Sequence, residues 1–426
     1  MSKLILKKID WIIIFTYALL VGTGWLNIYS TTVAEENAAL FDLGFAYGKQ
    51  LLFIGVSLFL ILLVFILNSK LYERFASIYY LIFVGLLAGL FLFGTTISGA
   101  TSWYVIGPFS LQPSEFAKVA TALALAKYVS DIQTDLRAVR YQLRAFVILI
   151  IPALLTLLQP DPGTALTYIA FLFVLYREGL PSVYLLFPVI TALLFILTLI
   201  LGPYWVSAGI AFTGLCYIFI RKRKRKRVRY LPLFLILAAA ALFSLSVPAI
   251  FDNVLEQRHR DRFSLWLNLE KDPQKIEQIK RTIGYNTHQS EIAISSGKLL
   301  GKGFLEGTLT KGDFVPEQHT DYIFTSVGEE WGFLGGLVVV LLFVLLLFRL
   351  FILAERQKSK FARVYGYSVV SLFFVHFFIN IGMVIGLLPT VGIPLPFFSY
   401  GGSGLLSFTL LLFIFLKLNT NKYIHA

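Results

Sequence analysis

The feature that most constrains this chain is a series of long apolar stretches that recurs along almost its whole length. A helix needs about 20 mostly apolar residues to cross about 30 Å of hydrocarbon. Hydrophobic residues make up 57% and charged residues 14% of the chain, so it is far more apolar than a soluble domain. We therefore predict an all-α polytopic integral membrane protein with about 10–12 transmembrane helices and one large extracytoplasmic loop. The candidate spans are approximately 10–31, 47–67, 75–96, 113–129, 143–159, 162–177, 181–201, 204–220, 231–249, 323–351, 364–388 and 401–418.

Basic residues orient these spans, because they gather in alternate connections. If the N-terminus is cytoplasmic, all of these connections lie on the cytoplasmic side, as the positive-inside rule requires, and both termini are cytoplasmic. The densest basic run, 221–229, lies between two candidate spans that leave no room for a folded domain. We interpret this cytoplasmic loop as a topological anchor and expect no nucleic-acid partner. The formal net charge of +13 then reflects loops that face anionic membrane lipid.

The spans divide the chain into three regions. Residues 1–250 are expected to form an N-terminal membrane bundle of about nine spans, and residues 323–426 a C-terminal group of about three. Residues 10–31 lack a small-residue cleavage site, so we expect a retained first helix and no signal peptide. Between the two groups, 251–322 is the one long connection, with mixed charges unlike the rest of the chain. It falls on the extracytoplasmic side, and we expect it to carry the catalytic site.

Ionisable residues at membrane depth are costly, so each one marks a candidate buried site. In the first polar cluster, 98–118, the string Gln112-Pro-Ser-Glu-Phe-Ala-Lys118 opens a helix with proline in its first turn. Glu115 and Lys118 are three residues apart, so they share one helix face and can pair. The sequence leaves two interpretations open: an ion pair that only ties helices together, or part of a functional site.

Two further clusters interrupt helices. In Gln159-Pro-Asp-Pro-Gly-Thr164, two prolines free backbone groups beside Asp161, which is either a site residue or the N-cap of the next helix. The segment 381–404 is dense in Gly and Pro, which predicts a broken helix and a re-entrant connection. Its freed carbonyl and amide groups must be satisfied inside the protein or in a cavity. A tight packing turn is the alternative.

The long connection carries the remaining polar residues. Arg258, Arg260 and Arg262 form a candidate pyrophosphate clamp, since guanidinium groups bind phosphate oxygens in a bidentate manner, although basic residues near a membrane also bind anionic lipid generically. Just beyond the connection, at least one of the adjacent Glu329 and Glu330 must face a polar interior. Glu317, His319 and Asp321 lack the second histidine that a metal site would favour, so a metal site stays unknown.

Together these clusters resemble the SEDS family (shape, elongation, division and sporulation proteins), and its RodA-like elongation branch more than its FtsW division branch. The amino-acid sequence of residues 386–396 favours the elongation branch. The resemblance spans nearly the whole chain. The strings that carry it are Gly107-Pro-Phe, Gln112-Pro-Ser-Glu-Phe-Ala-Lys118, Gln159-Pro-Asp161, Gly163-Thr164, Pro316-Glu317, His319-Thr-Asp-Tyr-Ile-Phe324, Glu329-Glu330, Gly392-Ile-Pro-Leu-Pro396 and Ser399-Tyr-Gly-Gly-Ser403.

The resemblance implies a peptidoglycan glycosyltransferase of the bacterial cytoplasmic membrane. It would polymerise lipid II into glycan strands on the outer face during cell elongation, invert the anomeric centre and release undecaprenyl pyrophosphate. The family's catalytic aspartate precedes a proline in the large loop, and Asp272 matches it. The candidate substrate-binding residues are Trp103, Glu115, Lys118, Asp161, Arg258, Arg260, Arg262, Gln289, Glu317, His319 and Asp321.

The same resemblance implies partners: lipid II, the growing glycan strand, membrane lipid and a class B penicillin-binding protein that acts as transpeptidase. No cofactor is assigned, although a divalent cation, Mg²⁺ or Mn²⁺, would suit a diphosphate leaving group. The family typically has ten spans, and an added pair around 181–220 would account for twelve. A rival interpretation is a flippase or transporter of the lipid-linked precursor, but no inverted repeat is visible and the polar residues concentrate on one side.

Overall fold

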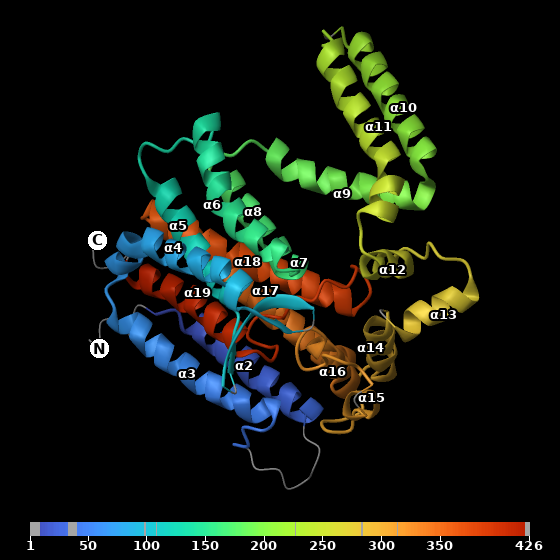
Figure 1. Cartoon of the computed structure of the whole chain (residues 1–426). Coiled ribbons are helices and arrows are strands. Elements are labelled where there is room, and N and C mark those ends of the chain that lie inside the picture. Colours follow the sequence, from blue (N-terminus) through green and yellow to red (C-terminus); the bar gives the residue numbers. More distant parts are fainter. Residues whose placement is uncertain are drawn as a thin grey trace. The chain divides into compact units, whose positions relative to one another are not determined.

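The computed structural model describes residues 9–32, 41–97, 99–107, 109–225, 227–282, 284–312 and 314–421. Figure 1 shows a chain built mainly of helices. Within the described ranges, ten helices are long and apolar enough to cross a membrane, which confirms the predicted fold class. They are α2 (Trp11–Thr32), α3 (Ala46–Ile66), α4 (Ser69–Phe93), α6 (Val139–Leu158), α9 (Val183–Leu201), α10 (Pro203–Arg223), α11 (Tyr230–Asn253), α17 (Gly332–Glu355), α18 (Lys360–Val384) and α19 (Gly402–Asn421).

Two further predicted spans are helical, but neither contains a single helix that is both long and apolar enough to cross a membrane by itself. The window 113–129 is one helix, α5 (Pro113–Ser130), whose charged residues and many alanines make it less apolar than its neighbours. The window 162–177 is divided into α7 (Pro162–Leu166), the 3₁₀ turn η1 (Thr167–Ile169) and α8 (Ala170–Arg177).

The predicted span 323–351 is also interrupted. It consists of α16 (Ile323–Glu330) and α17, with Gly332 between them at φ +65°. This left-handed conformation is one that glycine adopts without steric cost, and it breaks the helix. The segment before it contains α14 (Tyr285–Ser296) and α15 (Thr308–Lys311). Its extracytoplasmic placement stays a prediction.

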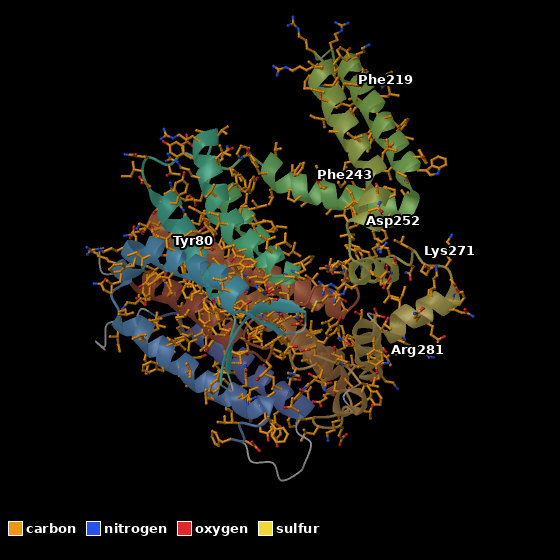
Figure 2. All side chains as sticks on the ribbon, viewed as in Figure 1. Tyr80, Phe219, Phe243, Asp252, Lys271 and Arg281 are labelled. Carbon is orange, nitrogen blue, oxygen red and sulfur yellow. The ribbon has the colours of Figure 1, made fainter. Side chains whose placement is uncertain are left out.

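The chain forms two compact units. The first comprises Met1–Pro181 and Asn286–Ala426, and the second comprises Ser182–Tyr285. The second unit contains α9, α10, α11, α12 (Gln257–Trp266) and α13 (Pro273–Arg281). In it α10 and α11 pair as a helical hairpin, on which Figure 2 labels Phe219 and Phe243. This division follows packing, so the predicted topological division at 250 and 322 is not tested by it.

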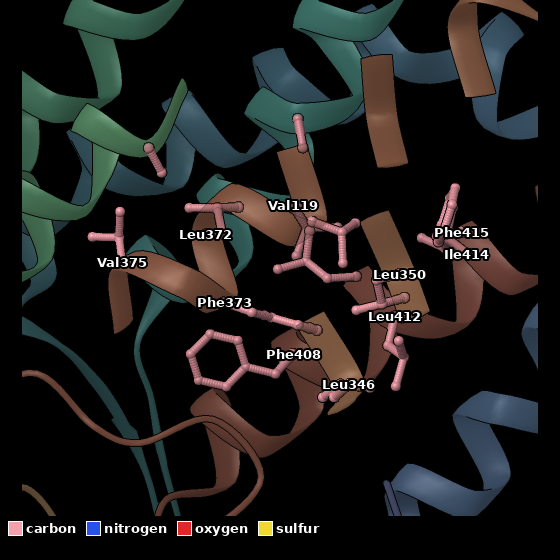
Figure 3. Packing of buried hydrophobic residues seen from close by; sticks show 14 of the residues in the cluster. Val119, Leu346, Leu350, Leu372, Phe373, Val375, Phe408, Leu412, Ile414 and Phe415 are labelled. Carbon is pink, nitrogen blue, oxygen red and sulfur yellow. The ribbon is translucent and has the colours of Figure 1, made fainter. Parts of the chain in front are cut away.

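The core of the first unit surrounds α5 and α18. Small residues along α5 allow close helix approach, and most of its side chains are buried between α4, α6, α18 and α19. Figure 3 shows Phe373 of α18 beside Phe408 of α19, with ring centroids 5.9 Å apart. Leu346 and Leu350 of α17 contribute to the same cluster. The packing holds α5 at the centre of the unit.

A small antiparallel sheet, which the sequence did not predict, leads into α5. Its strands are β1 (Thr95–Ile97), β2 (Ala100–Ile106) and β3 (Phe109–Leu111), in the order β1-β2-β3. Trp103 lies opposite Thr95, and Tyr104 opposite Leu111. The hydroxyl of Tyr104 donates to the Leu86 carbonyl of α4 at 2.9 Å, which ties the sheet to the bundle. The sheet therefore leads from α4 into α5 and is attached to α4.

Candidate active site

The start of α5 is fixed by the first turn of α19. Gln112 is the N-cap of α5, and Pro113 follows in the first turn, where a missing N–H costs nothing. The backbone N–H of Gln112 donates to Ser403 Oγ at 2.9 Å. Two strings that are almost 300 residues apart in sequence, Gln-Pro-Ser-Glu and Ser-Tyr-Gly-Gly-Ser, therefore meet at this point.

The predicted pair of Glu115 and Lys118 is present and buried. Lys118 Nζ lies 2.8 Å from Glu115 Oε1, and the two residues are 0% and 2% exposed. Ser407 of α19 donates to the other Glu115 oxygen at 3.3 Å, and His376 Nε2 lies 3.0 Å from Lys118 Nζ. Buried charges require partners of this kind. Neither residue reaches solvent, so the structure shows a buried ion pair, and the predicted role of both in substrate binding stays a prediction.

Asp161 takes one of the two roles that the sequence left open, the N-cap of the next helix, and its role as a site residue stays a prediction. Its carboxylate caps α7 by accepting from the Thr164 N–H at 3.0 Å, and it also accepts from Gln112 Nε2 at 3.2 Å. Burial raises the pKa of the Asp161 carboxyl above its ordinary value. The second polar cluster is thus joined to the first through a side-chain contact between Gln112 and Asp161.

The Gly- and Pro-rich connection after α18 packs against the same place. A Cβ at Gly163 would lie 2.8 Å from the Val391 carbonyl oxygen, so only glycine allows this approach. Gly392, at φ +80°, lies beside Asp321, since a Cβ there would be 3.1 Å from Asp321 Oδ2. The prediction of a broken helix with freed backbone groups is confirmed, because α18 ends at Val384 and α19 begins at Gly402.

His319 and Asp321 are placed by this connection. The His319 carbonyl accepts from the Tyr400 N–H at 2.8 Å, and the two rings pack at 5.4 Å. Asn380 of α18 donates to the Asp321 carbonyl at 2.8 Å. Glu317 is exposed, and its carboxylate accepts from the Thr320 hydroxyl at 3.0 Å. The His319 and Asp321 backbone is therefore held against the connection, and Glu317 lies at the surface.

Two more predicted residues lie in the first unit. Trp103 is half-buried in β2, close in sequence to Thr101, whose N–H donates to the Gln159 carbonyl at 3.2 Å. Gln289 is half-buried on α14. The next residue, Ser290, contacts the Thr325 hydroxyl of α16 at 2.6 Å, so α14 is attached to the helix that follows Asp321.

The other predicted residues lie in the second unit. Asp272 is exposed and is the N-cap of α13, where it accepts from the Gln274 N–H at 3.0 Å. Figure 2 labels Lys271, which precedes this helix, and Arg281, its last residue. A carboxylate at a helix N-terminus is favoured by the helix dipole. Asp272 is thus an accessible carboxylate with a fixed backbone.

The three arginines all lie on α12. Arg258 pairs with Glu256 at 2.7 Å, and Arg260 Nη1 donates to the Asp252 carbonyl at 2.8 Å. Arg258 and Arg262 are four residues apart and share one helix face, whereas Arg260 is two residues from each. Burial, and then the guanidinium groups of Arg258 and Arg262, lower the pKa of His259. This local positive field suits an anionic ligand.

Sequence reasoning missed several residues that connect the clusters. His376 and Asn380 contact Lys118 and the Asp321 carbonyl from α18, and Ser403 and Ser407 contact Gln112 and Glu115 from α19. A signal was present for two of them, because a histidine and an asparagine four residues apart in an apolar span are costly unless they have buried partners. In the described ranges, no three His, Cys, Asp or Glu residues are placed to hold a metal ion.

The chain is similar over most of its length to known proteins. A model of the FtsW/RodA/SpoVE family, described as a cell cycle protein, matches residues 10–232 and 210–424. Peptidoglycan glycosyltransferase RodA of Treponema pallidum is 32% identical over 421 residues, which cover 93% of this chain and 94% of the relative. Peptidoglycan glycosyltransferase MrdB of Escherichia coli is 33% identical over 339 residues, which cover 79% of this chain and 75% of MrdB.

Solved structures are similar as well. A chain from a study of how a peptidoglycan synthase complex coordinates polymerization and crosslinking is 25% identical, with a TM-score of 0.68. The rod shape determining protein RodA of Thermus thermophilus is 25% identical, with a TM-score of 0.61. Both matches cover 97% of this chain and 98% of the solved chain.

Proposed function

The chain belongs to the FtsW/RodA/SpoVE family, and on this premise we propose that it is a peptidoglycan glycosyltransferase that polymerises lipid II during cell elongation. It is a multi-pass membrane protein, as the ten apolar helices indicate. The observation that carries the proposal is the meeting of three separate polar clusters at Gln112, which contacts Asp161 and Ser403, in a chain that matches RodA and MrdB over most of its length.

The reaction needs a base and a stabilised leaving group. The 4-hydroxyl of an acceptor GlcNAc attacks the anomeric carbon of a MurNAc that is bound to the lipid diphosphate. A new C–O bond forms, the bond to the diphosphate oxygen breaks, and the anomeric centre inverts. Asp272 accepts the hydroxyl proton, and such a base contributes about 10²–10⁴-fold. Arg258, Arg260 and Arg262 stabilise the negative charge on the departing undecaprenyl pyrophosphate.

Sugar recognition is assigned in this proposal to side chains of the polar clusters. Asp161, His319 and Asp321 offer groups that bind hydroxyl and amide groups, and Trp103 offers a flat apolar face. Gln289 and Glu317 are the more peripheral members of the proposed substrate site. The buried Glu115 and Lys118 do not contact the sugar in this proposal, and they fix the start of the helix that carries Gln112.

Orientation and partner follow from the same premise. We place the active face on the outer side of the cytoplasmic membrane and both termini in the cytoplasm, because the basic connections then all lie inside. A class B penicillin-binding protein is the proposed transpeptidase partner. The structural similarity to a chain of a synthase complex that couples polymerization to crosslinking supports this partner.

Purified protein given labelled lipid II in detergent tests the activity. We expect glycan strands, whereas a flippase would move lipid II across vesicle membranes without making a polymer. Asp272→Asn should abolish polymerisation and leave lipid II affinity nearly unchanged, because only transition-state interactions are lost. Glu277→Gln is the matched control, since Glu277 is another exposed acid of α13 and pairs with Arg281. Near-normal turnover in Asp272→Asn would show that Asp272 is not the base, and Asp161, Glu317 and Asp321 would then be the carboxylates to test.

A further inference from the structure

One face of α18 carries two polar side chains that the proposed mechanism does not use. His376 and Asn380 lie four residues apart and are 1% and 0% exposed. Asn380 Nδ2 donates to the Ile393 carbonyl at 2.7 Å, and His376 Nδ1 lies 3.4 Å from the Pro394 carbonyl. These carbonyls belong to the connection between α18 and α19, where no helix provides their partners. The two side chains therefore bind backbone groups that the broken helix left free.

The tautomer of His376 follows from its second contact. A lysine ammonium group can only donate, so His376 Nε2, 3.0 Å from Lys118 Nζ, must accept. The ring proton is then on Nδ1, where it donates to the Pro394 carbonyl. Phe408 packs edge-on against the His376 ring at 4.9 Å and lies 5.3 Å from the Lys118 ammonium. The imidazole thus joins Lys118 to the connection in one defined orientation.

We propose that His376 is a positioning residue, which holds Lys118 in its pairing geometry with Glu115 and couples that pair to the connection at Pro394. The proposal rests on the proposed glycosyltransferase function. Lys118 is fully buried, and the structure gives its ammonium two acceptors in the described residues, Glu115 and His376. Removing one acceptor leaves a buried cation underpaired and free to turn, which moves the helix start that carries Gln112.

Two substitutions separate the two contacts of the ring. His376→Asn retains a polar group near the Nδ1 position, close to Pro394, but it is too short to reach Lys118. His376→Gln extends an acceptor to the Nε2 position, close to Lys118. We expect kcat for lipid II polymerisation to fall about tenfold or more in the Asn variant, with KM within about twofold, and to be largely retained in the Gln variant. Equal losses in the two variants, or a larger loss in the Gln variant, would overturn the proposal.

A second measurement does not depend on activity. A double-mutant cycle of His376→Asn and Lys118→Met, followed by thermal unfolding in detergent, should give strongly non-additive shifts in melting temperature, because both changes remove the same contact. Additive shifts contradict the proposal even if the wild-type protein polymerises lipid II. An inactive wild type with a non-additive cycle would instead refute the glycosyltransferase assignment and leave the His376–Lys118 contact supported.

Discussion

The adjacent acids Glu329 and Glu330 at the end of α16 give a prediction whose size follows from the structure. Glu329 is fully buried and caps α15, accepting from the backbone N–H groups of Thr308, Leu309 and Thr310 at 3.0, 3.0 and 2.9 Å. It also accepts from Lys302 Nζ at 2.6 Å. Glu330 instead accepts a hydrogen bond from the Ser30 hydroxyl of α2, and its second oxygen has no hydrogen-bond partner in the described residues.

The change Glu329→Gln keeps the shape and removes the charge. An amide NH₂ group replaces the carboxylate oxygen that accepts from the Thr310 N–H. Because an NH₂ group cannot accept this hydrogen bond, one charge-assisted hydrogen bond is lost, and the others weaken because the charge is gone. Each such bond contributes about 1.5–3 kcal/mol, so we expect local stability to fall by about 3 kcal/mol. Hydrogen exchange of the Thr308, Leu309 and Thr310 amides should then accelerate about 100-fold.

Glu330→Gln is the matched control. Burial raises the pKa of Glu330. Burial also acts to raise the pKa of Glu329, but the hydrogen bonds that its carboxylate accepts outweigh this effect, so the net pKa of Glu329 is lowered. The Glu330 carboxylate accepts from Ser30 and not from the amides of α15, so exchange at Thr308 to Thr310 should change little. Mass-spectrometric exchange on both variants in the same detergent provides the measurement. Equal acceleration in the two variants, or a greater effect at position 330, would refute the reasoning.

The two pKa shifts also make the stability of the protein depend on pH in opposite directions. The folded-state pKa of Glu329 is lowered, so its contribution to stability is present above its unfolded pKa and is lost as pH falls through the folded value. The folded-state pKa of Glu330 is raised, so its contribution is present below the unfolded pKa and is lost as pH rises through the folded value. The wild-type protein should therefore lose stability as pH rises through the folded-state pKa of Glu330, and the Glu330→Gln variant should not show this loss.

Three further predictions concern other parts of the chain. Asp161→Asn should keep the cap of α7, since asparagine is a good N-cap, while turnover falls at least about tenfold; a lower melting temperature with normal turnover would make Asp161 only a cap. Gly163→Ala should destabilise the protein by about 1–3 kcal/mol in thermal unfolding, because a backbone oxygen cannot move aside, whereas Gly22→Ala, in open space, should not. Cysteines introduced in 251–322 should react with an impermeant reagent from outside, and those in 221–229 only after permeabilisation; the reverse pattern would overturn the predicted topology.

Hydrophobic patterning predicted the helical membrane fold, because a bilayer imposes a length and polarity that a single sequence reveals. It overestimated the continuity of 323–351, where one glycine at positive φ ends the helix. The sheet before α5 was missed, since its three short strands carry no strong alternation. The expectation that at least one of Glu329 and Glu330 faces a polar interior is met by Glu329, which accepts from Lys302 and from the amides of α15.

Site prediction succeeded for residues whose chemistry is local and stopped at contacts between distant segments. Spacing alone indicated that Glu115 and Lys118 can pair, because three residues along a helix bring side chains together. Spacing could not show that Gln112 reaches Asp161 or that His376 reaches Lys118, since these contacts depend on how α5, α7 and α18 pack. The roles of Asp272 and the α12 arginines stay predictions.

The burial of α5 has a consequence for biosynthesis. This helix has little apolar surface of its own and carries Glu115, Lys118 and Lys127. A charged residue in a lone helix adds to the cost of leaving the translocon for lipid, by about 2.5–3.5 kcal/mol at the helix centre and by less toward its ends. The nascent α5 therefore has no stable place in the bilayer until α4, which precedes it, and α6, which follows it, are available to cover it. We expect a ribosome-bound chain that ends within α6 to hold α5 at the translocon, and release to occur only as a group of helices.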